Sequence, residues 1–287
     1  MKTKTANSLG KYLSVVANVR QQWRIPKHLE LWFRAEDLRH NRTRLQPGVY
    51  RSRDSGKKKS LDKLLEIDND LYREFGRCAT QLSTPDANAI EDEWDSYFLM
   101  QHHGVPTRLL DWSDGSLIAL HFAISKKKRV PESGSVIYML DPHWLTKLLR
   151  QHPDRKDAIN RWKQFAKKHP SDYDEDDWER LYLPAEKDEI KNKLLKTPVT
   201  PMLWDSPHVT RRIAAQRSRF MIFGTDSLWL VNRAKERGSR LMAIKIPKNA
   251  ISNIRQELKD AGITESVVFP DFDGLGRELK QVWEMRH

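Results

Sequence analysis

The stretch YFLMQHHGVPTRLLDWSDGSLIALHFAI, residues 97–124, contains the clearest succession of structural signals in this 287-residue chain. Its first part has apolar residues at helical spacing, and Gly104 and Pro106 then end the helix. The next four residues, 107–110, read as a short buried strand, because a proline precedes them and a polar Asp-Trp-Ser-Asp run follows. The expected order begins with a helix and a strand.

A polar turn over residues 111–114 and a second helix over residues 117–124 complete this order. Ser113 or Asp114 could accept hydrogen bonds from the free amide groups at the start of that helix. The stretch therefore predicts helix, strand, turn and helix in immediate succession.

Five polar residues of this stretch lie around the two ends of its short strand: His102, His103, Arg108, Asp111 and Ser113. Taken singly, each has an ordinary structural explanation as a helix cap, a surface group or half of an ion pair. Taken together in one compact turn, they predict a functional site.

The composition predicts a single globular domain over residues 1–287, with a helical insertion at about 141–205. No Gly/Ser-rich or Pro-rich linker divides the chain, and 38% hydrophobic residues with ten tryptophans can form a substantial core. Cys78 is the single cysteine, no apolar run reaches the length of a membrane span, and the first ten residues lack the apolar core of a signal peptide. We expect a cytoplasmic protein without a membrane partner.

The remaining elements are predicted from periodicity and turn residues. Further strands are expected over residues 28–37, 49–51, 135–140, 220–223, 241–246 and 266–269. Further helices are expected over residues 8–23, 61–75, 249–261 and 275–285, with another beginning at Pro142. In the strand expected over residues 28–37 the apolar run stops at Arg34. We expect this arginine to lie at the end of the strand that carries the function.

The charge of the chain favours a polyanionic partner. Lys and Arg number 51 against 39 Asp and Glu, a net charge of +12, which suits nucleic acid through the release of counterions. The window HVTRRIAAQRSRFMIF, residues 208–223, contains four arginines that suit phosphate recognition: Arg211, Arg212, Arg217 and Arg219. A basic loop that leads into a strand is an equally good interpretation of this window.

Several segments together resemble the FRG-domain family. LWFRA, residues 31–35, resembles its (F/Y)-R-G motif, and QHHGVPTRLLDW, residues 101–112, resembles its QHxGxPTRLLDW core. Weaker matches are residues 45–51, 119–123, 212–220 and 268–275. One departure is Ala35 at the position of the motif glycine, where a methyl group crowds the approach of a ligand to the backbone.

The resemblance implies an α+β fold with an ADP-ribosyltransferase-like split β-sheet core, a helical N-terminal segment and helical insertions. It also implies NAD as a substrate and no metal. The catalytic residues that it implies are Arg34, Asp111 and Gln216. The residues that it implies for binding NAD are Phe33, Arg34, His102, Thr107, Arg108, Leu110, Trp112 and Ser113.

The implied chemistry assigns different tasks to these side chains. Departure of nicotinamide leaves an oxocarbenium-like ribose, so the protein must fix the ribose and stabilise positive charge. Asp111 is the expected carboxylate for that charge, or the general base. Gln216 stands where a glutamate is common, and its amide can hold a hydroxyl but cannot take a proton.

The leading hypothesis is the transfer of ADP-ribose from NAD to a nucleic acid, most simply RNA. Such an activity suits a bacterial toxin or antiphage effector held in check by an antitoxin or another inhibitory protein. Two alternatives stay open. One is a non-catalytic, basic module that binds nucleic acid or a nucleotide, and the other is a metal-dependent nuclease that uses His102, His103 and Asp111.

Overall fold

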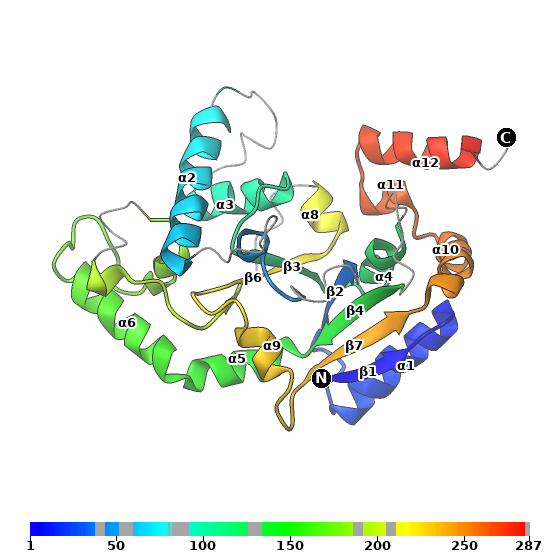
Figure 1. Cartoon of the computed structure of the whole chain (residues 1–287), viewed down its shortest axis with the longest axis horizontal. Helices are drawn as coiled ribbons and strands as arrows, with labels where there is room; N and C mark the ends of the chain where they lie inside the picture. The colour runs from blue at the N-terminus through cyan, green and yellow to red at the C-terminus, as the bar shows by residue number, and fades with distance from the viewer. Residues whose placement is uncertain are drawn as a thin grey trace.

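The computed structural model describes residues 1–37, 44–51, 60–79, 81, 92–125, 134–185, 192–204 and 211–284 (Figure 1). Within these residues a seven-stranded sheet has the order β1-β7-β4-β2-β3-β6-β5. The strands are β1 (Lys2–Thr5), β2 (Trp32–Asp37), β3 (Leu109–Ser113), β4 (Ser135–Leu140), β5 (Met202–Trp204), β6 (Ser218–Ile222) and β7 (Leu241–Ile246). β1 pairs with β7 in parallel, and the other neighbours are antiparallel.

The sheet opens between β2 and β3. β2 pairs with β4 along all of its residues, from Trp32 opposite Leu140 to Asp37 opposite Ser135. Between β2 and β3, in contrast, the described residues pair at a single position, Phe33 opposite Ser113. The backbone ladder therefore ends there, and beyond it the side chain of Arg34 on β2 bonds to the backbone oxygen of Asp111 on β3.

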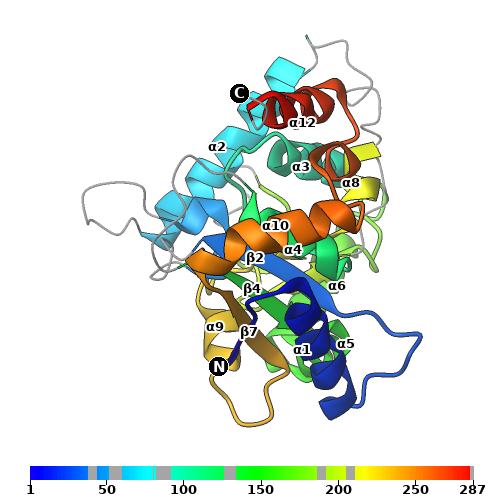
Figure 2. The same cartoon turned by 90° about the vertical axis from the view of Figure 1, so that its right-hand side faces the viewer.

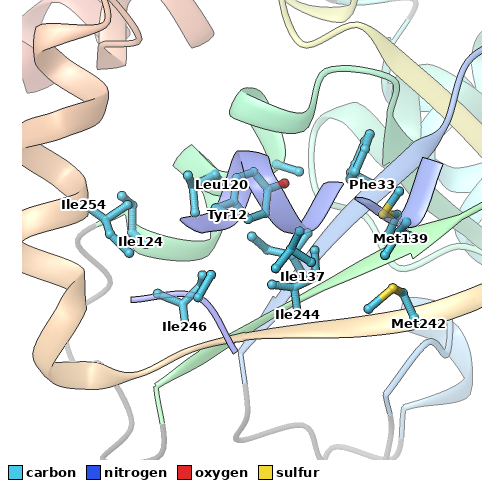
Figure 3. Packing of buried hydrophobic residues seen from close by; sticks show 14 of the residues in the cluster. Tyr12, Phe33, Leu120, Ile124, Ile137, Met139, Met242, Ile244, Ile246 and Ile254 are labelled. Carbon is cyan, nitrogen blue, oxygen red and sulfur yellow. The ribbon is translucent and has the colours of Figure 1, made fainter. Parts of the chain in front are cut away.

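Helices cover one face of the sheet in two groups. The first group lies over one half of this face and consists of α1 (Leu9–Gln22), α4 (Ser116–Ile124) and α10 (Ile251–Asp260). Alternate strand residues such as Phe33, Ile137 and Ile244 point into this layer, as expected for a period of two. Figure 3 shows them packed against Tyr12 and Leu120. This core holds β2 and β4 beneath α4.

The other half of the same face is covered by α3 (Glu93–His102), α6 (Pro153–Ala166) and a 3-10 turn at Trp178–Tyr182. Leu109 of β3 and Phe220 of β6 enter this second core. Leu109 and Ser113 share a face because they are four positions apart on the strand, and Ser113 lies opposite Phe33. The two cores thus flank the opening in the sheet.

The opposite face is covered by α5 (Pro142–Gln151) and α9 (Trp229–Arg233). Trp32, Leu110 and Met221 point into this third core. Both faces of the sheet are therefore covered, which explains why every residue of β4 is buried and why all of them after Ser135 are apolar or aromatic.

The other helices are α2 (Leu61–Ala79), α8 (Arg211–Ala215), α11 (Glu265–Val268) and α12 (Phe272–Glu284). Further 3-10 turns lie at Gly48–Tyr50, Lys193–Leu195 and Lys248–Ala250. None of the helices in the described part of the chain has the length and apolar character that crossing a membrane requires.

The α+β class is confirmed, and most predicted elements are present, but several local predictions were wrong. Residues 49–51, predicted as a strand, contribute to a 3-10 turn, and residues 266–269, also predicted as a strand, fall in and after helix α11. β3 begins at Leu109 and continues through Ser113, where a polar turn was expected. The insertion predicted at about 141–205 contains α5 and α6, and its end supplies the edge strand β5.

Candidate functional site

A cavity of about 350 Å³ lies over the opening in the sheet. Its floor is formed by β2, β3 and β6, and its walls by the end of α3, by α4, by α8 and by Phe269 after α11. This size is near the lower end of the range of about 300–1,000 Å³ that is common for ligand pockets. Eight of the predicted site residues line it: Phe33, Arg34, His102, Asp111, Trp112, Ser113, Arg212 and Gln216.

The central stretch brings these side chains together through one tight turn. α3 ends at His102, and Gly104 adopts a φ of +80°, a left-handed conformation that a side chain would make costly. The chain then reverses into β3, where Asp111 and Ser113 occupy one face. Gln101 and His102 consequently lie beside Asp111 at the mouth of the cavity.

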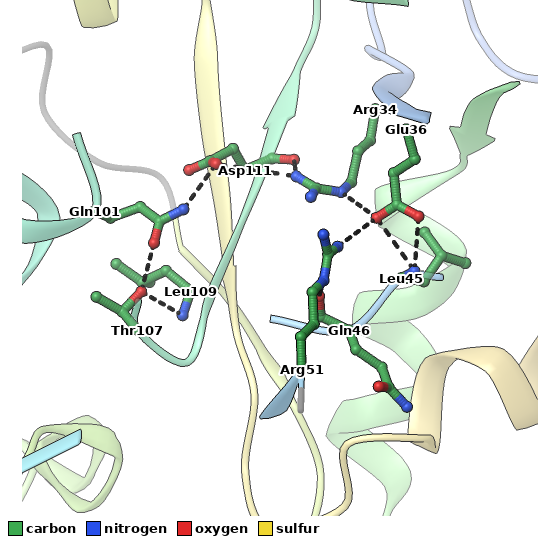
Figure 4. Close-up of polar contacts among 9 residues, drawn as sticks. All are labelled: Arg34, Glu36, Leu45, Gln46, Arg51, Gln101, Thr107, Leu109 and Asp111. Atoms are coloured by element: carbon green, nitrogen blue, oxygen red, sulfur yellow. Dashed lines mark hydrogen bonds and ion pairs between the residues drawn. The ribbon is translucent and has the colours of Figure 1, made fainter. Parts of the chain in front are cut away.

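Arg34 bridges the two strands at the opening (Figure 4). Its Nε donates to Glu36 Oε1 at 3.0 Å, and its Nη1 donates to the backbone oxygen of Asp111 at 2.7 Å. The distance from Nη1 to Asp111 Oδ2 is 3.9 Å. β2 continues to Asp37, so Arg34 lies inside the strand, whereas the sequence analysis placed it at a strand end. Arg34 still faces the cavity because the backbone pairing between β2 and β3 has already ended at Phe33.

Glu36 holds Arg34 in this orientation. Its buried carboxylate also accepts hydrogen bonds from Arg51 Nη2 at 3.0 Å and from the backbone N of Leu45 at 3.0 Å. Arg51 Nε in turn donates to the backbone oxygen of Gln46 at 2.8 Å. Burial lowers the pKa of Arg51, and the Glu36 carboxylate opposes that change. The sequence analysis missed Glu36, although its two-residue spacing from Arg34 on a strand was a usable signal.

Asp111 is oriented by a chain of hydrogen bonds. Gln101 Nε2 donates to Asp111 Oδ2 at 2.8 Å, and Gln101 Oε1 accepts from Thr107 Oγ1 at 2.6 Å. Thr107 Oγ1 accepts from the backbone N of Leu109 at 3.0 Å, so its proton is directed to Gln101. Within the described part of the chain, Oδ1 of Asp111 has no hydrogen-bond partner, and half of the side chain is exposed. This oxygen can therefore receive a ligand.

Gln216 closes the far side of the cavity, between β3 and α11. Ser113 Oγ donates to the backbone oxygen of Gln216 at 2.7 Å. The side-chain Nε2 of Gln216 makes a long bond of 3.4 Å to the backbone oxygen of Val268. The weak contact leaves the amide able to exchange this partner for a ligand hydroxyl.

Arg212 adds a positive charge at the cavity wall. Its guanidinium carbon lies 4.5 Å from the centre of the Phe269 ring, a cation–π contact, and Arg277 approaches the same ring at 4.8 Å. Partial burial lowers the pKa of Arg212, with Asp271 opposing the change. Arg212 has no ion-pair partner among the residues that the structure describes, so its charge is available to an anion.

The structure does not bring Arg108, Thr107 or Leu110 to the cavity wall. Arg108 is 1% exposed and pairs with the fully buried Asp68 at 2.7 Å. Burial alone would lower the pKa of Arg108, but the Asp68 carboxylate raises it, so the guanidinium stays charged. Arg108 joins α2 to β3 and to the backbone oxygens of Phe223 and Tyr182. Thr107 acts on the site only through Gln101, and Leu110 packs in the core on the opposite face.

The four arginines of the second window have different environments. Arg217 pairs with Asp114, and Arg219 pairs with Asp114 at 2.6 Å and with Glu30 at 3.0 Å. The side chain of Arg211 lies outside the described part of the structure. Of the three arginines whose side chains the structure describes, Arg212 is the one that lines the cavity.

The histidine pair has a simple geometry. The rings of His102 and His103 meet edge to face with centroids 5.2 Å apart, and His102 lines the cavity while His103 is exposed. The described residues contain no group of three His, Cys, Asp or Glu side chains that could hold a metal ion.

Fold and site together define an α+β domain with a polar cavity at an opening in its sheet. Residues 30–132 match the family model of the FRG domain, so this part of the chain is an FRG domain. The match runs from the start of β2 past the end of α4 and includes Arg34 and Asp111, but not Arg212 or Gln216. No curated protein and no solved structure matches the chain.

Proposed function

We propose that this protein transfers ADP-ribose from NAD to a nucleic acid, with RNA as the acceptor. The observation that carries the proposal is the convergence of Arg34, Asp111 and Gln216 on one cavity at the opening between β2 and β3. These are the three residues that the family resemblance implies as catalytic, and they come from three separate segments of the chain. The single pairing position between β2 and β3 also supports an ADP-ribosyltransferase-like split sheet.

The lining of the cavity fits the parts of NAD. Phe33, Phe122 and Phe269 offer aromatic surface for a flat ring such as nicotinamide. Arg34 and Arg212 offer guanidinium groups for a diphosphate. When bound, NAD supplies an ADP-ribosyl group that is joined to nicotinamide by the bond to be broken.

Each polar residue then has a definite task. Asp111 presents Oδ1 to the positive charge that develops at the ribose, while Gln101 holds Oδ2. Gln216 can bind a ribose hydroxyl through its amide but cannot act as a base. Asp111 is therefore the carboxylate that we assign to charge stabilisation or to removal of a proton from the acceptor.

The net charge of +12 supports the choice of a polyanionic acceptor. Modified RNA would harm the cell that makes the protein. We therefore place the activity in a bacterial toxin or antiphage effector that an inhibitory protein restrains.

The test is transfer of adenylate label from NAD into separate pools of RNA, DNA and protein, with nicotinamide release measured in parallel. We expect label in RNA, and we expect Arg34→Ala and Asp111→Asn to abolish both signals. Arg73→Ala is the matched control, because Arg73 is an exposed arginine on α2 that pairs with Asp70 and does not line the cavity. Full activity of Arg34→Ala, or a folded wild-type protein that releases no nicotinamide, would refute the proposal.

Arg212 favours a second candidate, a nucleic-acid-binding module without catalysis. Arg212 has no ion-pair partner among the described residues and lies beside an aromatic ring, which suits it to a phosphate or a base. This function predicts RNA binding that weakens with salt and does not change when NAD is added. Arg212→Ala should weaken the binding, whereas Asp111→Asn should leave it unchanged.

A further inference from the structure

Helix α12 turns its apolar side to solvent. Four large apolar residues of this helix are exposed: Phe272 by 92%, Leu275 by 43%, Leu279 by 59% and Trp283 by 61%. Gly274 is the one residue of α12 that is buried. An ordinary surface helix buries its apolar stripe against the core, so the orientation of α12 is reversed. A contiguous exposed stripe of this kind marks an interaction surface.

The reversed orientation is fixed by contacts on the other side of the helix. Gly274 lies so close to Phe269 that a Cβ atom on it would be 2.0 Å from the Phe269 backbone oxygen. Glu278 accepts a hydrogen bond from the backbone N of Ser266 at 2.8 Å, and Arg277 pairs with Glu265 at 2.7 Å. Figure 1 and Figure 2 both show α12 at the periphery of the molecule. The stripe therefore faces outward because α11 holds the opposite face.

The sequence of the stripe is self-complementary. Its members are spaced by three, four and four residues, with an aromatic residue at each end and a leucine at each inner position. If two such helices meet antiparallel about a two-fold axis, Phe272 of each copy meets Trp283 of the other, and Leu275 meets Leu279. An interface between identical copies requires this kind of symmetry.

The charges beside the stripe have the same symmetry. Asp273 and Lys280 are both exposed and lie on the same flank of α12, because seven residues make two helical turns. Their midpoint is within about one residue of the midpoint of the stripe, a shift of roughly 1.5 Å along the axis. In the antiparallel arrangement Asp273 of each copy meets Lys280 of the other, which gives two opposite-charge pairs.

We propose that α12 is a homodimerisation surface, on which a second copy of this chain packs antiparallel about a two-fold axis. The stripe supplies the apolar contact, and the Asp273–Lys280 pairs set the register. The proposal is independent of any catalytic activity of the cavity.

The first test is the mass of the full-length protein by sedimentation equilibrium over a series of concentrations. We expect a reversible monomer–dimer equilibrium, and we expect Leu279→Glu to leave a folded monomer. Leu228→Glu is the matched control, since Leu228 is a similarly exposed leucine outside α12. Wild-type protein that stays monomeric throughout the series would overturn the proposal, as would Leu279-dependent binding to lipid vesicles by a protein that remains monomeric.

The second test fixes the orientation of the two helices. Asp273→Lys and Lys280→Asp should each weaken the dimer by about tenfold or more, because each change places like charges together twice. Mixing the two single variants should restore association, since both pairs in the mixed dimer are again opposite in charge, and the double variant Asp273→Lys/Lys280→Asp should dimerise by itself. Dimers that are unaffected by the single changes would rule out the antiparallel register.

Discussion

Nη1 of Arg34 donates to the backbone oxygen of Asp111 at 2.7 Å, just beyond the position where the ladder between β2 and β3 ends. A side chain thus makes the cross-strand bond that a backbone amide would make in a continuous sheet. The interruption leaves the space that becomes the cavity, and Glu36 keeps Arg34 from swinging out of it. The residue that we assign to ligand binding is also the residue that holds the opening together.

The Arg34→Lys variant should lose almost as much activity as the Arg34→Ala variant. A lysine keeps the positive charge, but its ammonium group lacks the planar fork with which the guanidinium contacts Glu36 and the Asp111 oxygen together. We expect nicotinamide release to fall by about 10²- to 10³-fold, the usual cost of removing a positioned donor. Single-turnover assays measure this directly, with urea unfolding as the check on stability. A lysine variant with wild-type turnover would mean that charge alone suffices.

Gln101→Leu should impair the site without unfolding the protein. The change removes the donor that fixes Asp111 Oδ2 and leaves the Thr107 hydroxyl without its acceptor. Turnover should fall by about tenfold or more, since loss of orientation is costly in a catalytic site. The matched control is Gln256→Leu, because Gln256 makes a similar bond to Asp260 on the exposed side of α10. Equal effects of the two changes on turnover would remove Gln101 from the mechanism.

The sequence alone was sufficient to predict the helices and strands whose apolar periodicity is unambiguous. β4 and β7 were predicted at their observed bounds, and α1 and α10 to within a few residues, because burial of these segments follows directly from their periodicity. The motif around residues 101–112 contains His102, Asp111 and Trp112, and the structure places all three around one cavity. The recognition of the family is confirmed over residues 30–132.

The errors came from residues whose environment depends on distant segments. Asp111 and Ser113 were predicted in a turn because they are polar, but they continue β3 since their face meets the cavity. Arg108 resembled a site residue, and nothing local identifies Asp68, forty positions away, as its partner. Phe269 was predicted in a strand from its apolar neighbours, yet its position follows from its contacts with Arg212 and Phe122.

The buried pair of Arg108 and Asp68 should behave non-additively in stability. Arg108→Met should lower the free energy of unfolding by about 3–5 kcal/mol, because it leaves the Asp68 carboxylate buried with Tyr97 as its remaining partner. Adding Asp68→Leu should recover part of that loss, since the unpaired charge is removed. Urea unfolding of the two single variants and the double variant closes the cycle. If the double variant loses the sum of the single losses, the pair does not act as a unit.

Stability should fall in mild acid because of His121 on α4. Burial lowers the pKa of His121 from its ordinary value of 6.5, while Glu265 and Glu278 oppose the change and Arg255 adds to it. Its Nδ1 is buried and finds no hydrogen-bond partner among the described residues, so a proton placed there would have no acceptor. The unfolded chain therefore binds a proton near pH 6.5 and the folded protein at a lower pH. The resulting loss of stability begins as the pH falls below about 6.5 and amounts to about 1.4 kcal/mol for each unit of difference between the two pKa values.

His121→Gln should remove this part of the pH dependence. The glutamine amide can still donate toward Glu265, which lies 3.4 Å from Nε2 of the histidine, but it takes no proton. We expect the wild-type protein to lose more stability than the variant between pH 7.5 and pH 5.5, measured by urea unfolding at each pH. His143→Gln, a change at an exposed histidine, is the control for general effects of replacing a histidine. Parallel pH profiles for the wild type and His121→Gln would show that the acid sensitivity arises elsewhere in the chain.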